Sequence, residues 1–92
     1  MARRSIAYRE GALEDLAGLR AYDRARVVDE IDHQLTDAPT VPTARRKPVA
    51  VAGLACWQLR IGEFRVFYRV DSGVVEVLMV RRKGRETTGE IT

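Results

Sequence analysis

The chain has 92 residues and a formal net charge of +3 at pH 7, with 46% hydrophobic and 32% charged residues. This length suits one domain, expected over residues 1–92, with a modest core. No apolar run approaches the roughly 18 residues of a transmembrane helix, and no apolar stretch follows the basic start of the chain, which excludes a secretory signal. The single Cys56 cannot form an internal disulfide, and we expect a cytoplasmic protein with no membrane partner.

The first 40 residues predict a strand followed by two helices. Residues 4–8 alternate in polarity and predict the strand. A helix over about residues 10–19 is predicted from the apolar spacing of Ala12, Leu13, Leu16 and Leu19. Asp23 is a suitable N-cap for a second helix that ends at Ala38-Pro39. The buried stripe of this helix would comprise Val27, Val28, Ile31 and Leu35.

The second half of the chain predicts β structure. Three prolines and a glycine within residues 39–53 indicate an irregular loop with room for one short strand. Three strands follow over about residues 55–61, 64–70 and 74–81, and a polar tail runs from Arg82 to Thr92. The predicted fold class is α+β: an N-terminal strand, a two-helix hairpin and an antiparallel three-stranded meander.

The first predicted hairpin places two arginines face to face. A two-residue turn at Gly62-Glu63, with glycine first, fits a type II′ turn. This register pairs Arg60 with Arg65 on one face, beside a pair of Gln58 and Phe67. The opposite face is apolar throughout and pairs Ile61 with Phe64, Leu59 with Val66 and Trp57 with Tyr68. Like charges directly opposite destabilise a sheet, by roughly 0.2–1 kcal/mol, so the pair is expected to hold an anion.

The second predicted hairpin, with Ser72-Gly73 at its tip, extends this face. It pairs Arg69 with Glu76, which assigns Arg69 to a structural ion pair. Continuing the same register pairs Phe67 with Leu78 and Arg65 with Val80, and it places Arg82 two residues further on the same face. The predicted basic face therefore carries Arg60, Arg65 and Arg82, with Phe67 nearby.

Charge is distributed unevenly along the chain. Residues 1–40 carry six basic and eight acidic side chains, a net charge of −2, whereas residues 41–92 carry ten and five, a net charge of +5. Because the excess falls on the half that contains the paired arginines, we interpret this half as facing a polyanion.

The hairpin and its surroundings resemble the RelE/ParE superfamily of type II toxin–antitoxin toxins, over nearly the whole chain. The resemblance is carried by a Leu-Arg-x-Gly-x-(aromatic)-Arg-Val-x-Tyr hairpin at residues 59–68 and by the valine-rich strand at residues 74–80. The segment Arg45-Arg46-Lys47-Pro48 is similar to the basic element that precedes the family's hairpin. The resemblance implies a RelE-like fold and neutralisation by a cognate antitoxin. It also implies either mRNA cleavage on the ribosome, as in RelE-like members, or poisoning of DNA gyrase, as in ParE-like members.

Site residues also follow from the resemblance. Arg65 matches the arginine that contacts the scissile phosphate, Arg60 matches a basic residue of the preceding strand, and Arg82 or Lys83 would assist them. Further RNA contacts are expected from Arg45, Arg46, Lys47, Phe67, Arg81 and Arg85. The alternative for the basic loop residues is that they only keep the loop soluble. The alternative for Phe67 is that it covers the sheet against Leu78.

Two departures from the family's pattern bear on the chemistry. Gln58 stands where the family has a further basic residue. Residues 84–92 contain neither the tyrosine nor the histidine of several active members. Lys83 and, less readily, Glu86 are the remaining acid or base candidates, since arginine stays protonated. His33 is interpreted as a solvated helix residue, and Trp57 and Tyr68 as core residues.

Three function classes remain. Paired arginines and a basic second half favour a ribosome-dependent mRNA endoribonuclease. The missing tail tyrosine or histidine favours a gyrase inhibitor, which would act by binding protein. A degenerate member that only binds its antitoxin is the third alternative. The sequence has no metal-ligand spacing, and no cofactor is expected.

Overall fold

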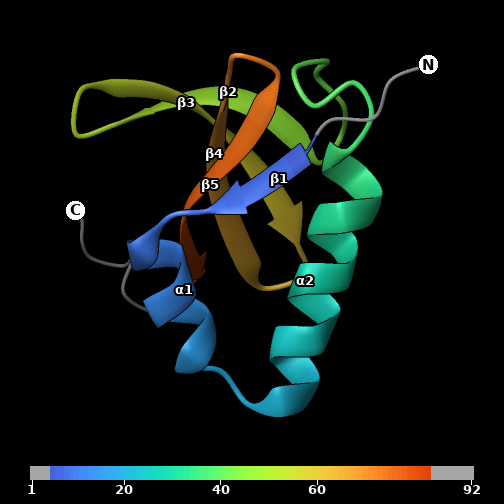
Figure 1. The fold of residues 1–92 in the computed structure, drawn as a ribbon, viewed down its shortest axis with the longest axis vertical. Helices are drawn as coiled ribbons and strands as arrows, with labels where there is room; N and C mark the ends of the chain where they lie inside the picture. The colour runs from blue at the N-terminus through green and yellow to red at the C-terminus, as the bar shows by residue number, and fades with distance from the viewer. Residues whose placement is uncertain (1–4, 84–92) are drawn as a thin grey trace.

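The computed structural model describes residues 5–83, so Arg4 and Arg85 lie outside the described part. Figure 1 shows its elements in chain order: β1 (Ser5–Tyr8), α1 (Glu10–Ala17), α2 (Ala21–Leu35), β2 (Arg46–Val51), β3 (Leu54–Ile61), β4 (Phe64–Asp71) and β5 (Val74–Arg82). The strands form one sheet in the order β1-β5-β4-β3-β2. β1 runs parallel to β5, and all other neighbours are antiparallel. The predicted α+β class is confirmed.

The antiparallel part of the sheet has four strands rather than the predicted three. β2 pairs with β3 from Arg46 opposite Leu59 to Val51 opposite Leu54. Ala52 and Gly53 join the two strands with positive φ angles of 52° and 81°, the signs that a type I′ turn requires. Alanine rarely adopts this conformation, so the sequence did not predict the turn. Pro48 is tolerated because β2 is an edge strand.

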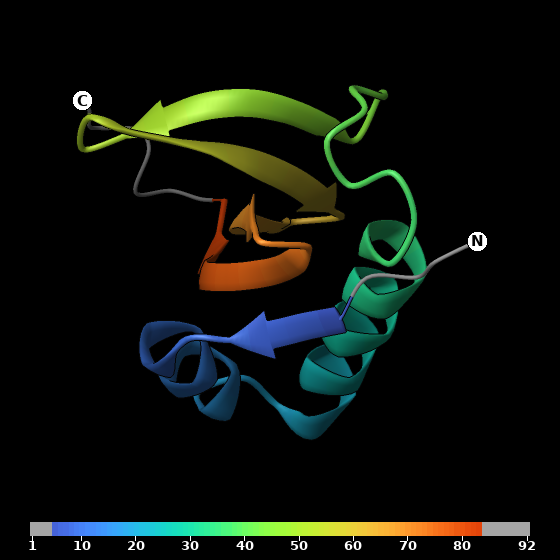
Figure 2. The same ribbon diagram turned by 45° about the horizontal axis from the view of Figure 1, so that its top comes forward.

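The helices differ from prediction at their starts and on their outer faces. α2 begins at Ala21, so Asp23 lies inside the first turn and not at the N-cap, which is Arg20. A carboxylate in the first turn still stabilises the positive end of the helix dipole. Leu13 and Val28 were expected in the buried stripes, but their side chains are 53% and 36% exposed. Both helices lie on one side of the sheet, and the β2–β3 hairpin turns away from them (Figure 2).

The core lies between the helices and one face of the sheet. The helices contribute Ala12, Leu16, Val27, Ile31 and Leu35, and the sheet contributes Leu59, Ile61, Phe64, Val66, Tyr68, Val75, Val77 and Val80. The buried hydroxyl of Tyr68 donates a hydrogen bond of 2.5 Å to the carbonyl of Pro39. Burial raises the pKa of Tyr68 to about 12. Trp57 stacks on Tyr68 with 6.5 Å between ring centroids, as expected for two core residues.

No helix within residues 5–83 has the length and apolar character that crossing a membrane would require. In the same residues, no three His, Cys, Asp or Glu side chains gather in a way that would hold a metal ion.

Candidate nucleic-acid interface

The β3–β4 hairpin has the predicted register. Its pairs run from Trp57 opposite Tyr68 to Ile61 opposite Phe64, with Arg60 directly opposite Arg65. Gly62 has a φ of +57°, and Glu63 has no positive φ, which agrees with a type II′ turn. Two guanidinium groups therefore project from neighbouring strands on the face away from the helices.

The β4–β5 hairpin follows the predicted register only as far as Tyr68. The register then shifts between Phe67 and Tyr68, so that Phe67 lies opposite Met79 instead of Leu78. Beyond this bulge Arg65 lies opposite Arg81, and the prediction of Val80 as its neighbour is wrong. A β-bulge places an extra residue in one strand. Beyond the bulge, each side chain of that strand faces the side of the sheet opposite to the one expected without it.

The bulge also moves Arg82 to the helix side of the sheet. Arg82 lies opposite Phe64, a core residue, and its guanidinium carbon is 4.7 Å from the centroid of the Phe64 ring. The prediction that Arg82 shares a sheet face with Arg65 is therefore wrong, although Arg82 also lines the groove described below. Arg81 takes the place beside Arg65 instead.

Four arginines consequently form one row across the sheet, called here the arginine row: Arg45, Arg60, Arg65 and Arg81. The last three are direct cross-strand neighbours. Arg45 immediately precedes β2 and joins the row because its carbonyl accepts a hydrogen bond of 2.8 Å from the amide of Arg60.

The arginine row lies in an open groove of about 530 Å³. The groove is lined by Thr43, Ala44, Arg45, Lys47, Gln58, Arg60, Arg65, Phe67, Arg81, Arg82 and Lys83. Seven of these eleven residues are basic, and no acidic side chain lines this groove in the described part of the chain. Such a surface attracts anions.

The basic side chains of the groove differ in whether they already have an acidic partner. Arg81 binds Asp15 of α1 at 2.5 Å, and Arg45 lies 3.8 Å from Glu30 of α2. Among residues 5–83, Lys47, Arg60 and Lys83 form no ion pair, and Arg65 donates only to the carbonyls of Gly62 and Phe64, each at 2.9 Å. The centre of the groove therefore carries positive charge that no described carboxylate neutralises.

Arg65 is the most constrained of these cations. Partial burial lowers the pKa of its guanidinium, and the neighbouring charge of Arg60 lowers this pKa further. The group still remains a cation, because arginine does not lose its proton in proteins. An anion bound between Arg60 and Arg65 would relieve their repulsion, and a guanidinium fork matches phosphate oxygens.

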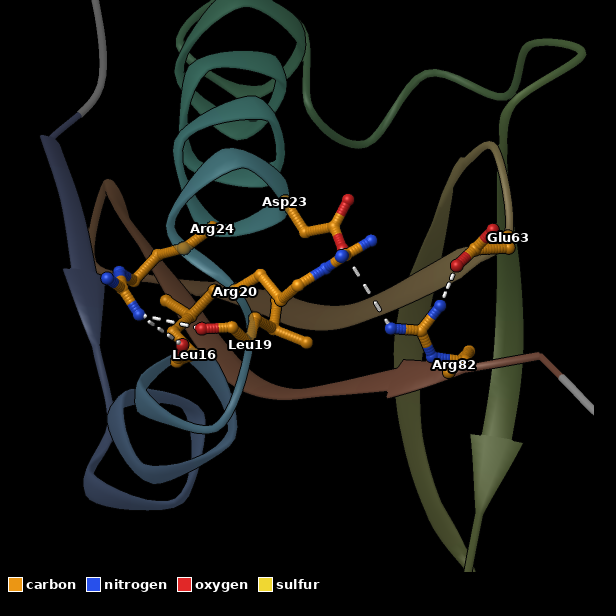
Figure 3. A network of polar contacts seen from close by, with 7 residues as sticks. All are labelled: Leu16, Leu19, Arg20, Asp23, Arg24, Glu63 and Arg82. Carbon is orange, nitrogen blue, oxygen red and sulfur yellow. Dashed lines mark hydrogen bonds and ion pairs between the residues drawn. The ribbon is translucent and has the colours of Figure 1, made fainter.

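A clamp on the helix side holds the turn that carries these arginines (Figure 3). Arg82 forms an ion pair with Glu63 of the turn and lies 4.0 Å from Asp23 of α2. Arg26 of α2 lies 5.7 Å from the Phe64 ring centroid, and its Nη2 atom would be 2.7 Å from a Cβ placed at Gly62. Arg65 is held in turn by its hydrogen bond to the Gly62 carbonyl. Sequence reasoning missed this clamp, because only the bulge brings Arg82 to the helices.

The remaining candidates lie in different places. Lys47 and Phe67 line the groove, as expected, and so does Lys83, whose amide donates to the carbonyl of Glu63 at 2.6 Å. Arg46 lies outside the groove, because its Nη1 donates to the carbonyl of Gln34 at 2.8 Å near the end of α2. Arg85 falls outside the described residues.

The structural ion pair predicted on the groove side of the sheet is confirmed. Arg69 and Glu76 are bound at 2.8 Å. Their hydrogen bond raises the pKa of Arg69 and lowers that of Glu76. Arg69 is therefore a cation of the same strand as Arg65 that lies outside the groove and has its own partner.

The fold is shared with solved structures of RelE-type proteins, which are similar to this chain at low sequence identity. A toxin–antitoxin complex, RelBE2 of Mycobacterium tuberculosis, matches with a TM-score of 0.71 and 24% identity over 87% of this chain and 98% of that chain. An archaeal RelE–RelB complex from Pyrococcus horikoshii matches with a TM-score of 0.70 and 21% identity over 89% and 97%. The YoeB/ParE toxin of Agrobacterium tumefaciens matches with a TM-score of 0.62 and 22% identity over 85% and 96%.

The sequence itself gives the family. The sequence model of the ParE toxin of type II toxin–antitoxin systems, parDE, matches residues 6–87. The chain belongs to this toxin family. No curated protein matches the sequence.

Proposed function

We propose that this toxin is a ribosome-dependent mRNA endoribonuclease. The observation that carries the proposal is the arginine row, which crosses three strands and includes Arg45 of the loop before β2. The whole row lies within one groove that no described carboxylate lines. A gyrase inhibitor that acts by binding protein has no need for guanidinium groups held against mutual repulsion at the centre of a groove. A phosphate of a nucleic-acid backbone satisfies this arrangement directly.

The arginine row suits the phosphate chemistry of RNA cleavage. In this reaction the ribose 2′-oxygen attacks the neighbouring phosphorus, the bond to the 5′-oxygen of the next nucleotide breaks, and a 2′,3′-cyclic phosphate remains. Negative charge builds up on the non-bridging oxygens in the transition state. Arg60 and Arg65 stabilise this charge, because preorganised donors in a constrained site need no rearrangement at the moment of reaction.

Proton transfer requires a different residue. No His, Tyr, Asp or Glu lines the groove within residues 5–83, so its lysines are the groups that can exchange a proton there. Lys83 is our candidate, because its backbone is fixed to the Gly62-Glu63 turn beside Arg65. No metal ion or cofactor takes part in this scheme.

The toxin's partner is a cognate antitoxin, for which a second, apolar groove provides a surface. This groove of about 420 Å³ lies between β1 and the helices and is lined by Tyr8, Leu13, Leu16, Ala17, Arg24 and Val28. Leu13 and Val28 are left exposed there although their sequence pattern is that of core residues. We propose that an apolar segment of the antitoxin covers this groove in the cytoplasm, where toxin, mRNA and ribosomes meet.

The test is controlled expression in bacteria with genome-wide mapping of mRNA 5′ ends. Wild-type protein should produce new in-frame ends inside translated codons, and Arg65→Ala should abolish both these ends and growth arrest. Arg69→Gln is the matched control, since it removes a cation of the same strand outside the groove and should leave cleavage intact. Growth arrest with intact mRNA and an induced DNA-damage response would overturn the proposal in favour of gyrase. Absence of growth arrest would also overturn it, leaving a member that only binds its antitoxin.

A further inference from the structure

A second row of side chains lies beside the arginine row, and its chemistry is different. Lys47 pairs with Gln58, Gln58 pairs with Phe67, and Phe67 pairs with Met79, across β2, β3, β4 and β5. Same-face residues two positions apart along a strand are separated by about 7 Å, so this row lies one such step from the arginine row. Lys47, Gln58 and Phe67 line the same groove as the arginines.

The two residues in the middle of this row, Gln58 and Phe67, offer two kinds of contact that a protein uses to bind a nucleobase: hydrogen bonds and an aromatic surface. Phe67 is partly exposed and offers an aromatic surface in the groove, while the other aromatic pair of the hairpin, Trp57 and Tyr68, faces the core. Gln58 is partly exposed as well, and its side-chain amide forms no hydrogen bond within residues 5–83. Directly paired side chains on a sheet have Cβ atoms about 4.5–5.5 Å apart, so both can contact one ligand.

We propose that Gln58 and Phe67 form a base-reading subsite for one unpaired nucleotide, whose phosphate is held by the arginine row. The base stacks on Phe67, and the amide of Gln58 hydrogen-bonds to the base edge. An amide offers a donor and an acceptor side by side, which matches the edge of adenine best. Gln58 thereby gives up the phosphate attraction that a basic residue would supply there and gains discrimination among bases. This inference rests on the proposed function, because it assumes that the arginine row binds an RNA backbone.

The bulge in β5 is what makes the subsite possible. Without it, Phe67 would lie opposite Leu78, and Arg81 would face the helices. With it, the arginine row extends to β5 through Arg81, while Phe67 has the flexible side chain of Met79 as its neighbour. The two rows therefore have distinct tasks: guanidinium groups bind the backbone, which carries no sequence information, and the Gln58–Phe67 pair reads the base.

The test is binding of short RNA by the purified full chain. The probe is a hexanucleotide with 2-aminopurine at one position, made uncleavable by a 2′-deoxy sugar at that position. Wild-type protein should quench the fluorescence of 2-aminopurine by stacking. Phe67→Leu should abolish this quenching and weaken binding of all four natural bases by roughly tenfold, since one base–aromatic stack contributes that much or more. Met79→Leu is the matched control and should retain quenching.

Gln58 is tested separately by base preference. Gln58→Leu should reduce the preference for adenine to less than twofold while quenching persists. Gln58→Lys should remove the preference as well, yet increase affinity and steepen the slope of log affinity against log salt by about 0.7, the value for one added phosphate contact on a single strand. Unchanged quenching in Phe67→Leu or unchanged preference in Gln58→Leu would overturn the inference. Arg65→Ala distinguishes a failure of the proposed function from a failure of this inference. If the arginine row does not bind RNA, Arg65→Ala will leave the affinity for RNA unchanged.

Discussion

Arg65 and Arg81 lie opposite each other across β4 and β5, and this pairing exists only because the strands change register at Phe67. The change exchanges the positions of two consecutive arginines: Arg81 joins the arginine row, and Arg82 lies opposite Phe64, where it binds Glu63 of the turn and contacts the Phe64 ring. We therefore expect two neighbouring residues of the same type to have different tasks, Arg81 in binding and Arg82 in holding the turn.

Alanine substitutions of these two arginines should separate the tasks. Arg81→Ala should weaken RNA binding several-fold and lower the salt dependence, with a small loss of stability, because an exposed ion pair contributes about 0.2–1 kcal/mol. Arg82→Ala should lower the free energy of unfolding by about 1–2 kcal/mol, since it loses an ion pair and a cation–π contact. Urea unfolding and RNA titrations of both variants check this. Equal effects of the two substitutions on binding would contradict the register described here.

Gly62 should tolerate a side chain less well than Gly73 does. Both glycines have positive φ angles, of 57° and 79°, so alanine at either position is strained by about 1 kcal/mol or more. A Cβ at Gly62 would also lie 2.7 Å from Nη2 of Arg26, whereas nothing lies within 4 Å at Gly73. Gly62→Ala should therefore cost about 0.5–1 kcal/mol more, the size of the Arg26–Phe64 contact that it displaces.

A double-mutant cycle isolates that contact. In the background of Arg26→Ala, the excess cost of Gly62→Ala over Gly73→Ala should disappear when the free energies of unfolding are compared. An excess that persists without the Arg26 side chain would mean that Gly62 is constrained by its turn alone.

The buried phenol of Tyr68 should make stability fall at high pH. Its pKa is raised from 10.0 to about 12 in the folded protein, so its contribution is fully present below pH 10 and is lost as the pH rises towards 12. A shift of this size corresponds to about 3 kcal/mol. Tyr68→Phe removes the hydrogen bond to Pro39 and should cost about 1 kcal/mol at pH 8. Its stability should then decline less steeply than that of wild type above pH 10, as measured by urea unfolding at each pH. Parallel curves would contradict this account.

The apolar groove on the helices should serve the antitoxin and not the RNA. Leu13→Glu should weaken antitoxin binding at least tenfold and leave the chain folded, because the residue it replaces is already 53% exposed. Leu54→Glu is the matched control, since Leu54 is 46% exposed on β3 outside this groove. Calorimetric titration with the antitoxin distinguishes the two. A toxin whose antitoxin affinity is insensitive to Leu13→Glu would place the interface elsewhere.

The sequence predicts the elements and the first hairpin well, because local signals determine them. Alternation of apolar residues and the turn at Gly62 fix the pairing of Arg60 with Arg65 without further information. The bulge was not predictable in this way, since nothing in residues 74–82 distinguishes an unpaired Leu78 from a paired one. The hairpin of β2 and β3 was not predicted for a related reason: its turn uses Ala52 in a conformation that alanine rarely adopts, so the sequence indicated only an irregular loop with room for one short strand.

The same distinction explains the errors at the site. Arg65, Arg60, Lys47, Lys83 and Phe67 were placed in the groove by the paired-strand pattern and the family resemblance. Arg46 lies outside the groove because its side chain donates to the Gln34 carbonyl near the end of α2. Arg82 lines the groove but lies opposite Phe64 because of the bulge, and it approaches Asp23 of α2. Such contacts join residues far apart in the sequence, and no local pattern predicts them.

The most direct test of the proposed function uses purified ribosomes that carry a defined mRNA codon in the A site. With excess toxin, single-turnover cleavage should appear within that codon and leave a 2′,3′-cyclic phosphate. Arg65→Ala should slow it at least a hundredfold, as expected when one donor to the transition-state charge is removed, while Arg69→Gln should not. Intact mRNA under these conditions, together with inhibition of DNA gyrase by the same preparation, would contradict the account.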